Sequence, residues 1–120
     1  MSIRLLVIDD EEAIRKLFIQ ALESTDCQVE TAESGEKGIE KARDTKFDFI
    51  FLDLKMPGLN GVETLRKLWE IEQAAHIYIT TGYYGDFNEQ LQRAVDDGIS
   101  FDLIKKPFDA DTICSIVRVV

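Results

Sequence analysis

Five side chains suited to acid, metal or nucleophilic chemistry stand at or just beyond the ends of apolar segments. Asp9 and Asp10 follow the first apolar run, and Asp53 follows the third. Thr81 ends the fourth run, and Lys106 comes two residues after the fifth. In an open parallel sheet, ligands bind outside the carboxyl ends of the strands. If the runs are strands of such a sheet, the three carboxylates, the hydroxyl and the ammonium group converge on one edge.

Three carboxylates gathered in one place require a compensating cation. Two carboxylates about 5 Å apart repel each other by roughly 3 kcal/mol at an effective dielectric constant near 20. Mg²⁺ takes oxygen ligands in octahedral geometry and keeps several waters, which suits one or two carboxylates, a backbone carbonyl and a phosphate oxygen. The sequence has no cluster of Cys and His for a softer metal, and we expect its single histidine, His76, to lie on the surface before the fourth strand.

A carboxylate beside Mg²⁺ can attack a phosphoryl group and form an aspartyl phosphate. Asp53 is the candidate for this nucleophile. The hydroxyl of Thr81 and the ammonium of Lys106 could then hold the oxygens of the attached group. Each of these residues, seen alone, is more often a turn former, a helix cap or a packing residue. The prediction therefore depends on their occurring together.

Five apolar runs of strand length are spaced along the chain. They cover residues 3–8, 27–32, 47–52, 77–81 and 101–104. The first and third are nearly continuous, which is typical of strands covered on both faces, and the second reads as an edge strand. All five alternate with segments that have helical periodicity, and this order predicts an α/β fold with a doubly wound parallel sheet and five helices.

The helical segments carry start and stop signals as well as apolar stripes. Ser34, Asn60 and Asp109 are placed to cap helix starts, and Gly98 is placed to end a helix predicted over Tyr84 to Asp97. The apolar residues of the stripes are Ile14, Leu17, Phe18, Ala21, Leu22, Ile39, Ala42, Val62, Leu65, Leu68, Trp69, Phe87, Leu91, Ala94, Val95, Ile113, Ile116, Val117 and Val120.

Composition narrows the class of protein. The chain has 120 residues, 45% of them hydrophobic, which fits one compact domain. Its formal net charge of -9 would repel a nucleic-acid backbone, so we expect no direct nucleic-acid binding. The sequence shows no signal peptide and no membrane span, which favours a cytoplasmic location. Cys27 and Cys114 are expected to be reduced and buried, without a disulfide or a zinc site.

With these residues in place, the sequence resembles the response regulator receiver domain of two-component signalling. The resemblance runs from about Ile3 to the C-terminus and rests on five markers in order: Asp9-Asp10, Asp53-Leu54-Lys55-Met56-Pro57-Gly58, Gly61, Thr81-Gly82 and Lys106-Pro107-Phe108. It implies the flavodoxin-like receiver fold with strand order 2-1-3-4-5.

The resemblance also implies roles for individual residues. Asp53 would be the phosphoacceptor. Mg²⁺ or Mn²⁺ would be held by Asp9, Asp10, Asp53 and the backbone carbonyl of Lys55. The phosphoryl oxygens would be bound by Thr81 and Lys106.

Two of these assignments involve a choice between neighbours. Thr81 is preferred over Thr80 because Gly82, a small residue, follows it and because strand alternation points Thr80 elsewhere. Lys106 is preferred over Lys105 because it directly precedes Pro107, where the family has a cis peptide bond. Lys105 is expected at a helix rim or in solvent.

The resemblance implies a signalling switch and not an enzyme with a separate substrate. A histidine kinase or a histidine phosphotransfer protein would donate the phosphoryl group. Phosphorylation would change contacts with an output domain or a downstream protein, and a phosphorylation-dependent homodimer is a further expectation. Residues 1–120 are interpreted as one receiver domain, either standing alone or forming the N-terminal part of a longer regulator. No membrane partner is expected.

The chain departs from the family pattern at one switch position, and other readings stay open. Leu103 stands where the family commonly has an aromatic residue, while Tyr83 could shield an acyl phosphate from water. A phosphorylation-independent interaction module of the same fold is one alternative. A haloacid-dehalogenase-like phosphatase is a weaker one, because such enzymes use Asp-x-Asp and Lys55 stands two residues after Asp53. Flavin or dinucleotide binding is weaker still, since no Gly-x-Gly-x-x-Gly follows the first strand.

Overall fold

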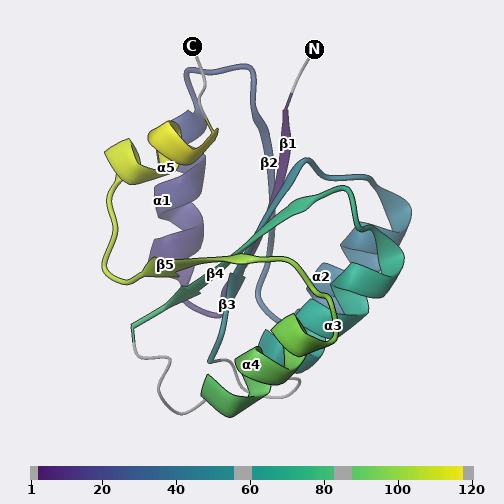
Figure 1. The fold of residues 1–120 in the computed structure, drawn as a ribbon. Coiled ribbons are helices and arrows are strands. Elements are labelled where there is room, and N and C mark those ends of the chain that lie inside the picture. Colours follow the sequence, from purple (N-terminus) through teal and green to yellow (C-terminus); the bar gives the residue numbers. More distant parts are fainter. Residues whose placement is uncertain (1–2, 56–60, 83–87, 118–120) are drawn as a thin grey trace.

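The computed structural model describes residues 3–55, 61–82 and 88–117. Strands and helices alternate along these residues, as predicted (Figure 1). The elements are β1 (Arg4–Ile8), α1 (Glu12–Leu22), β2 (Gln28–Ala32), α2 (Gly35–Asp44), β3 (Phe49–Asp53), α3 (Gly61–Ile71), β4 (His76–Thr81), α4 (Asn88–Asp96), β5 (Asp102–Lys105) and α5 (Ala110–Val117).

The five strands form one parallel sheet in the order β2-β1-β3-β4-β5. This confirms both the doubly wound sheet and the strand order. In the register of the sheet, Asp53 at the end of β3 lies opposite Thr80, and Thr81 lies opposite Lys105. Because all strands run in the same direction, their carboxyl ends meet at one edge, which is the edge predicted to carry the chemistry.

Helices cover both faces of the sheet (Figure 1). Helices α1 and α5 lie side by side on one face, and α2, α3 and α4 lie on the other. Successive strand residues point to opposite faces, so β1 contributes Leu5 and Val7 to the α1–α5 side and Leu6 and Ile8 to the α2–α4 side. The sheet is therefore buried on both sides, which explains the continuous apolar runs.

Local signals in the sequence set the helix ends. The Ser34 hydroxyl accepts a hydrogen bond of 3.2 Å from the Lys37 amide and caps α2. A carboxylate oxygen of Asp109 accepts a bond of 2.9 Å from the Thr112 amide at the start of α5. Gly98 has a φ of 88° just after α4, a conformation that a side chain would strain. These three predictions are confirmed, and the predicted cap at Asn60 lies outside the described residues.

Helix α3 begins in close contact with the backbone that follows Asp53. The amide of Gly61 donates to the carbonyl of Leu54 over 3.0 Å. A Cβ at Gly61 would lie 2.5 Å from the Leu54 carbonyl oxygen and 2.7 Å from that of Asp53. Glycine therefore allows α3 to start directly against the end of β3.

Some sequence expectations need correction. Val95 belongs to the predicted inward stripe but is 52% exposed, because Leu91 and Ala94 already turn the buried side of α4 toward the core. The described part of α4 is shorter than the predicted helix, and residues 83–87 lie outside the description. Cys27 and Cys114 are free, as expected, but only half-buried.

Two smaller expectations concern the surface and the membrane. His76 is exposed, as predicted, but it is the first residue of β4 instead of preceding it, and its ring stacks on Phe49. Among the residues that the structure describes, no helix is long and apolar enough to cross a bilayer.

Candidate functional site

The carboxyl ends of β1 and β3 bring three aspartates together. Asp9 and Asp10 follow β1, and Asp53 is the last residue of β3. One carboxylate oxygen from each of the three lies within 4.8 Å of the other two. Asp9 and Asp53 are buried, with 1% and 5% exposure, whereas Asp10 is exposed. The predicted convergence of these carboxylates is present in the structure.

The position of Asp9 is fixed on several sides. Its amide donates to the Ala32 carbonyl over 3.0 Å, and one carboxylate oxygen accepts from the Glu11 amide over 2.9 Å. The guanidinium of Arg15, one turn into α1, donates to the Asp9 carbonyl over 2.9 Å. These contacts hold the turn between β1 and α1, so the aspartates reach the edge of the sheet in a defined arrangement.

Among the residues described, Lys106 supplies the ammonium group that pairs with the buried aspartates at this edge. Its Nζ lies 3.1 Å from Asp9 Oδ2, 3.3 Å from Asp53 Oδ1 and 3.3 Å from Glu11 Oε1. The side chain is 14% exposed. The peptide bond between Lys106 and Pro107 is cis, as predicted, and the Lys106 amide donates to the Thr81 carbonyl over 2.7 Å. Strands β4 and β5 thus meet beside the aspartates.

The electrostatics of the cluster follow from burial and from crowding of like charges. Burial and the nearby charge of Asp9 raise the pKa of Asp53 to about 6, although Lys106 opposes the rise. Burial also raises the pKa of Asp9. Burial by itself would lower the pKa of Lys106, but Asp53 and Asp9 outweigh this effect and raise it. Lys106 is therefore held in its charged form, while the carboxylates are only partly compensated.

Asp53 and Lys106 border a hollow of about 290 Å³. It is lined by Glu11, Asp53, Lys55, Thr81, Gly82 and Lys106. A water molecule occupies about 30 Å³ in the liquid, so a phosphoryl group together with several waters would fit. Thr81 lines this hollow and Thr80 does not, although both are buried. Lys105 is exposed, which agrees with the preference for Lys106.

The donor set suits a hard divalent cation. All the candidate ligands are oxygens, which Mg²⁺ prefers to nitrogen or sulfur. The Lys106 ammonium pairs with Asp9 and Asp53, while the cluster holds three aspartates, so negative charge remains for a cation to neutralise. Asp10 is exposed, and one of its carboxylate oxygens already lies within 4.8 Å of those of Asp9 and Asp53, so an incoming ion can reach it. The residues present therefore fit the metal that the sequence predicts.

Sequence reasoning missed two contacts of the site. Glu11 reaches Lys106 across the cluster, and Arg15 supports the Asp9 carbonyl. Glu11 does stand in the acidic run after β1, but the spacing of a sequence cannot show which of several acids a lysine meets. Residues 56–58 and Tyr83, which belong to the predicted motif and its surroundings, lie outside the described ranges.

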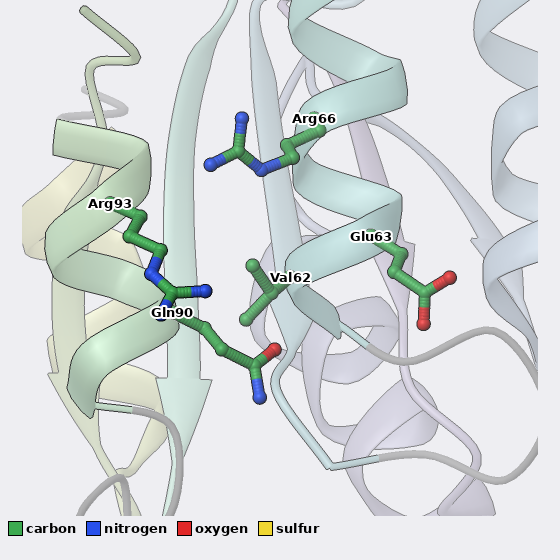
Figure 2. Close-up of a pocket in the computed structure, with 5 residues that line it drawn as sticks. All are labelled: Val62, Glu63, Arg66, Gln90 and Arg93. Carbon is green, nitrogen blue, oxygen red and sulfur yellow. The ribbon is translucent and has the colours of Figure 1, made fainter. Parts of the chain in front are cut away.

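A second hollow of about 320 Å³ lies between α3 and α4. Figure 2 shows Arg66 and Arg93 extending toward the gap between the two helices, while Glu63 points away from it. Val62 and Gln90 complete the lining. Arg66 is paired with Asp97 at 2.8 Å. None of the five residues that line this hollow belongs to the aspartate cluster at the carboxyl edge of the sheet.

Comparisons with known proteins cover nearly the whole chain. Residues 5–118 match the family model described as response regulator receiver domain. The transcriptional regulatory protein ResD of Bacillus subtilis is 34% identical over 106 residues, which are 88% of this chain and 42% of ResD. The chain therefore spans less than half the length of that relative.

Solved structures agree with this match. The chemotaxis protein CheY4 of Vibrio cholerae is 27% identical, with a TM-score of 0.83 and coverage of 100% of both chains. A response regulator protein from Burkholderia pseudomallei with a phosphorylated aspartic acid, calcium ion and citrate is 28% identical. Its TM-score is 0.79, over 94% of this chain and 65% of that chain.

Proposed function

Since this chain belongs to the family of response regulator receiver domains, we propose that it receives a phosphoryl group on Asp53 and acts as a switch in a two-component phosphorelay. The observation that carries the proposal is the cluster itself. A buried carboxylate at the end of β3 lies 3.3 Å from the Lys106 ammonium and within 4.8 Å of two further carboxylates. This arrangement combines a nucleophile, a cation and a metal-binding set at one point.

In the proposed reaction, a carboxylate oxygen of Asp53 attacks the phosphorus of a phosphohistidine on a partner. A bond forms between this oxygen and phosphorus, and the bond between phosphorus and the imidazole nitrogen breaks, with its electron pair leaving on the histidine. The attacking form is the carboxylate, so protonation of Asp53 would oppose the reaction. Its pKa of about 6 leaves most of the population ionised at neutral pH.

Asp9, Asp10, Asp53 and the carbonyl of Lys55 would hold Mg²⁺ or Mn²⁺ in this proposal. When bound, the ion would neutralise negative charge on the phosphoryl oxygens during transfer. Lys106 would contribute a second positive charge from the other side of the hollow, and Thr81 would donate a hydrogen bond to a phosphoryl oxygen. Both residues line the same hollow as Asp53, which supports these roles.

The partners follow from the same proposal. The phosphoryl donor would be a histidine kinase or a histidine phosphotransfer protein, and the exchange would take place in the cytoplasm. The similar Burkholderia protein, whose structure holds a phosphorylated aspartic acid and a calcium ion, supports the proposed phosphorylation of an aspartate. Residues 1–120 would form one receiver domain that controls an output domain or a separate protein, as the greater length of ResD suggests.

Phosphorylation-dependent homodimerisation is part of the proposal. Val95 on α4 and Leu103 on β5 are large apolar residues with 52% and 44% exposure. Such side chains offer apolar area to a partner. Leu103, which replaces the family's aromatic residue, would make the switch depend on another side chain.

Two other functions fit less well. A phosphorylation-independent module would need none of the acidic cluster, the lysine or the hydroxyl, yet all of them are gathered at one edge. A phosphatase of the haloacid-dehalogenase type would need an acid two residues after Asp53, where the chain has Lys55. The receiver function therefore accounts for more of the site.

Transfer from a phosphorylated histidine kinase tests the proposed role of Lys106. Lys106→Met should slow phosphoryl transfer to this domain by at least about tenfold, because one charge-assisted contact to the phosphoryl oxygens is lost. Lys105→Met is the matched control, since it removes the same charge from the exposed neighbouring residue. Equal rates for the two variants would contradict the assignment of Lys106.

A further inference from the structure

Glu11 occupies the N-cap position of α1 without capping the helix. An N-cap side chain usually accepts a hydrogen bond from an amide in the first turn, and short side chains such as Ser, Thr, Asp and Asn do this best. The Glu11 side chain makes no such bond. Its carboxylate instead reaches Lys106, 95 positions later in the sequence, with 3.3 Å between Oε1 and Nζ.

The three carboxylates around Lys106 are not equivalent. The Asp9 and Asp53 side chains are 2% and 6% exposed, whereas that of Glu11 is 60% exposed. Asp9 is also held by the Glu11 amide. Of the carboxylates that pair with Lys106 in the described part of the chain, Glu11 is therefore the one that can move into water without leaving a buried charge unpaired.

We propose that Glu11 is a positioning residue that holds Lys106 in the unphosphorylated domain and competes with the phosphoryl group for this ammonium. The inference rests on the proposed function, because it assumes that Asp53 becomes phosphorylated. An ammonium has three hydrogens to donate, and three carboxylates now surround it. A phosphoryl group on Asp53 would draw on the same ammonium, which donates hydrogen bonds to Asp9 and Glu11, and of these two partners Glu11 is the exposed one.

The competition has a direction. Removal of the Glu11 carboxylate leaves Lys106 more available, so a phosphoryl group or its mimic should bind more tightly. Glu11→Gln is expected to increase the affinity for beryllofluoride with Mg²⁺ by about two- to fivefold, the size of effect that a partly exposed ion pair supports. Affinity is measured by NMR titration of the domain.

Two further variants distinguish the contact between Glu11 and Lys106 from the effect of the negative charge of Glu11 alone. Glu12→Gln removes the same charge one residue later, where the carboxylate pairs with Lys16 at 2.9 Å, and should leave the affinity unchanged. Glu11→Asp keeps the charge but is shorter by one methylene group, so it should lose the contact with Lys106 and behave like Glu11→Gln. An Asp variant that matches the unmodified chain would overturn the proposal, because charge alone would then explain the effect.

A readout without any phosphoryl mimic keeps the inference distinct from the proposed function. The NMR signal of the Lys106 side chain should shift in Glu11→Gln and stay in place in Glu12→Gln. If it does not shift, the holding contact is absent and the inference fails, whatever Asp53 does. If it shifts but beryllofluoride binds no form of the domain, the proposed phosphoacceptor function fails and the competition fails with it.

Discussion

Asp53 is surrounded by charges that act on it in opposite directions. Burial and Asp9 disfavour its ionised form, and Lys106 favours it, with the net result that its pKa rises to about 6. The folded protein therefore binds a proton on Asp53 more tightly than the unfolded chain, whose carboxyl has the ordinary value of 3.8. The ionised form of Asp53 is therefore disfavoured in the folded protein, and a bound cation or an attached phosphoryl group would reduce the repulsion that it experiences.

This linkage predicts how Asp53→Asn changes stability. Between pH 4 and pH 6, Asp53 is protonated in the folded state but mostly ionised in the unfolded chain, so the free energy of unfolding falls as the pH rises. Above pH 6, Asp53 is ionised in both states, and its full destabilising effect is present. Asparagine cannot ionise and avoids this cost. The variant should be more stable by about 1–3 kcal/mol at pH 7.5 and nearly equal at pH 4, as measured by urea unfolding.

The control for this prediction is Asp26→Asn at an exposed loop position. It should leave the free energy of unfolding within about 0.5 kcal/mol at both pH values. Added Mg²⁺ should stabilise the unmodified chain more than Asp53→Asn, because the ion offsets the same repulsion. A variant that is less stable than the unmodified chain at pH 7.5 would show that Asp53 is not under electrostatic strain.

At the scale of elements, the site depends on how closely α3 approaches the end of β3. Gly61 provides this approach, since any side chain there would meet the backbone of Leu54 and Asp53. Gly61→Ala should destabilise the domain by about 1–3 kcal/mol, the range for inserting a methyl group into a well-packed place. The loss should appear as a lower urea midpoint with an unchanged slope.

Gly82→Ala provides the comparison for that variant. A Cβ at Gly82 would find its nearest neighbour, Lys106 Cβ, at 4.0 Å, which is ordinary contact. The stability of this variant should stay within about 0.5 kcal/mol of the unmodified chain. If both variants lost a similar amount of stability, crowding at the start of α3 would not be the reason why residue 61 has to be glycine.

The same scale shows where sequence periodicity succeeds and where it fails. The helix caps at Ser34 and Asp109 could be predicted because they depend on short local hydrogen bonds. Val95 could not be placed correctly from its spacing, because a stripe of apolar residues does not reveal how wide the buried side of a helix is. On α4 the core accommodates Leu91 and Ala94 but not Val95.

For the whole molecule, the decisive feature is that topology joins distant parts of the chain. Asp9, Asp53 and Lys106 come from three strand ends, and both carboxylates lie within 3.3 Å of the Lys106 ammonium. Their convergence could be predicted because parallel strands share one carboxyl edge. The contact between Glu11 and Lys106 could not, since it depends on side-chain conformations that no spacing rule specifies.

Intact mass spectrometry after incubation with acetyl phosphate tests the central claim most directly. The protein is compared with and without Mg²⁺, alongside Asp53→Asn. The account predicts a gain of one phosphoryl group that requires Mg²⁺ and is absent in the variant. A phosphoryl group that still attaches to Asp53→Asn, or none on the unmodified chain even with phosphorylated histidine kinases as donors, would contradict the assignment of Asp53 as phosphoacceptor.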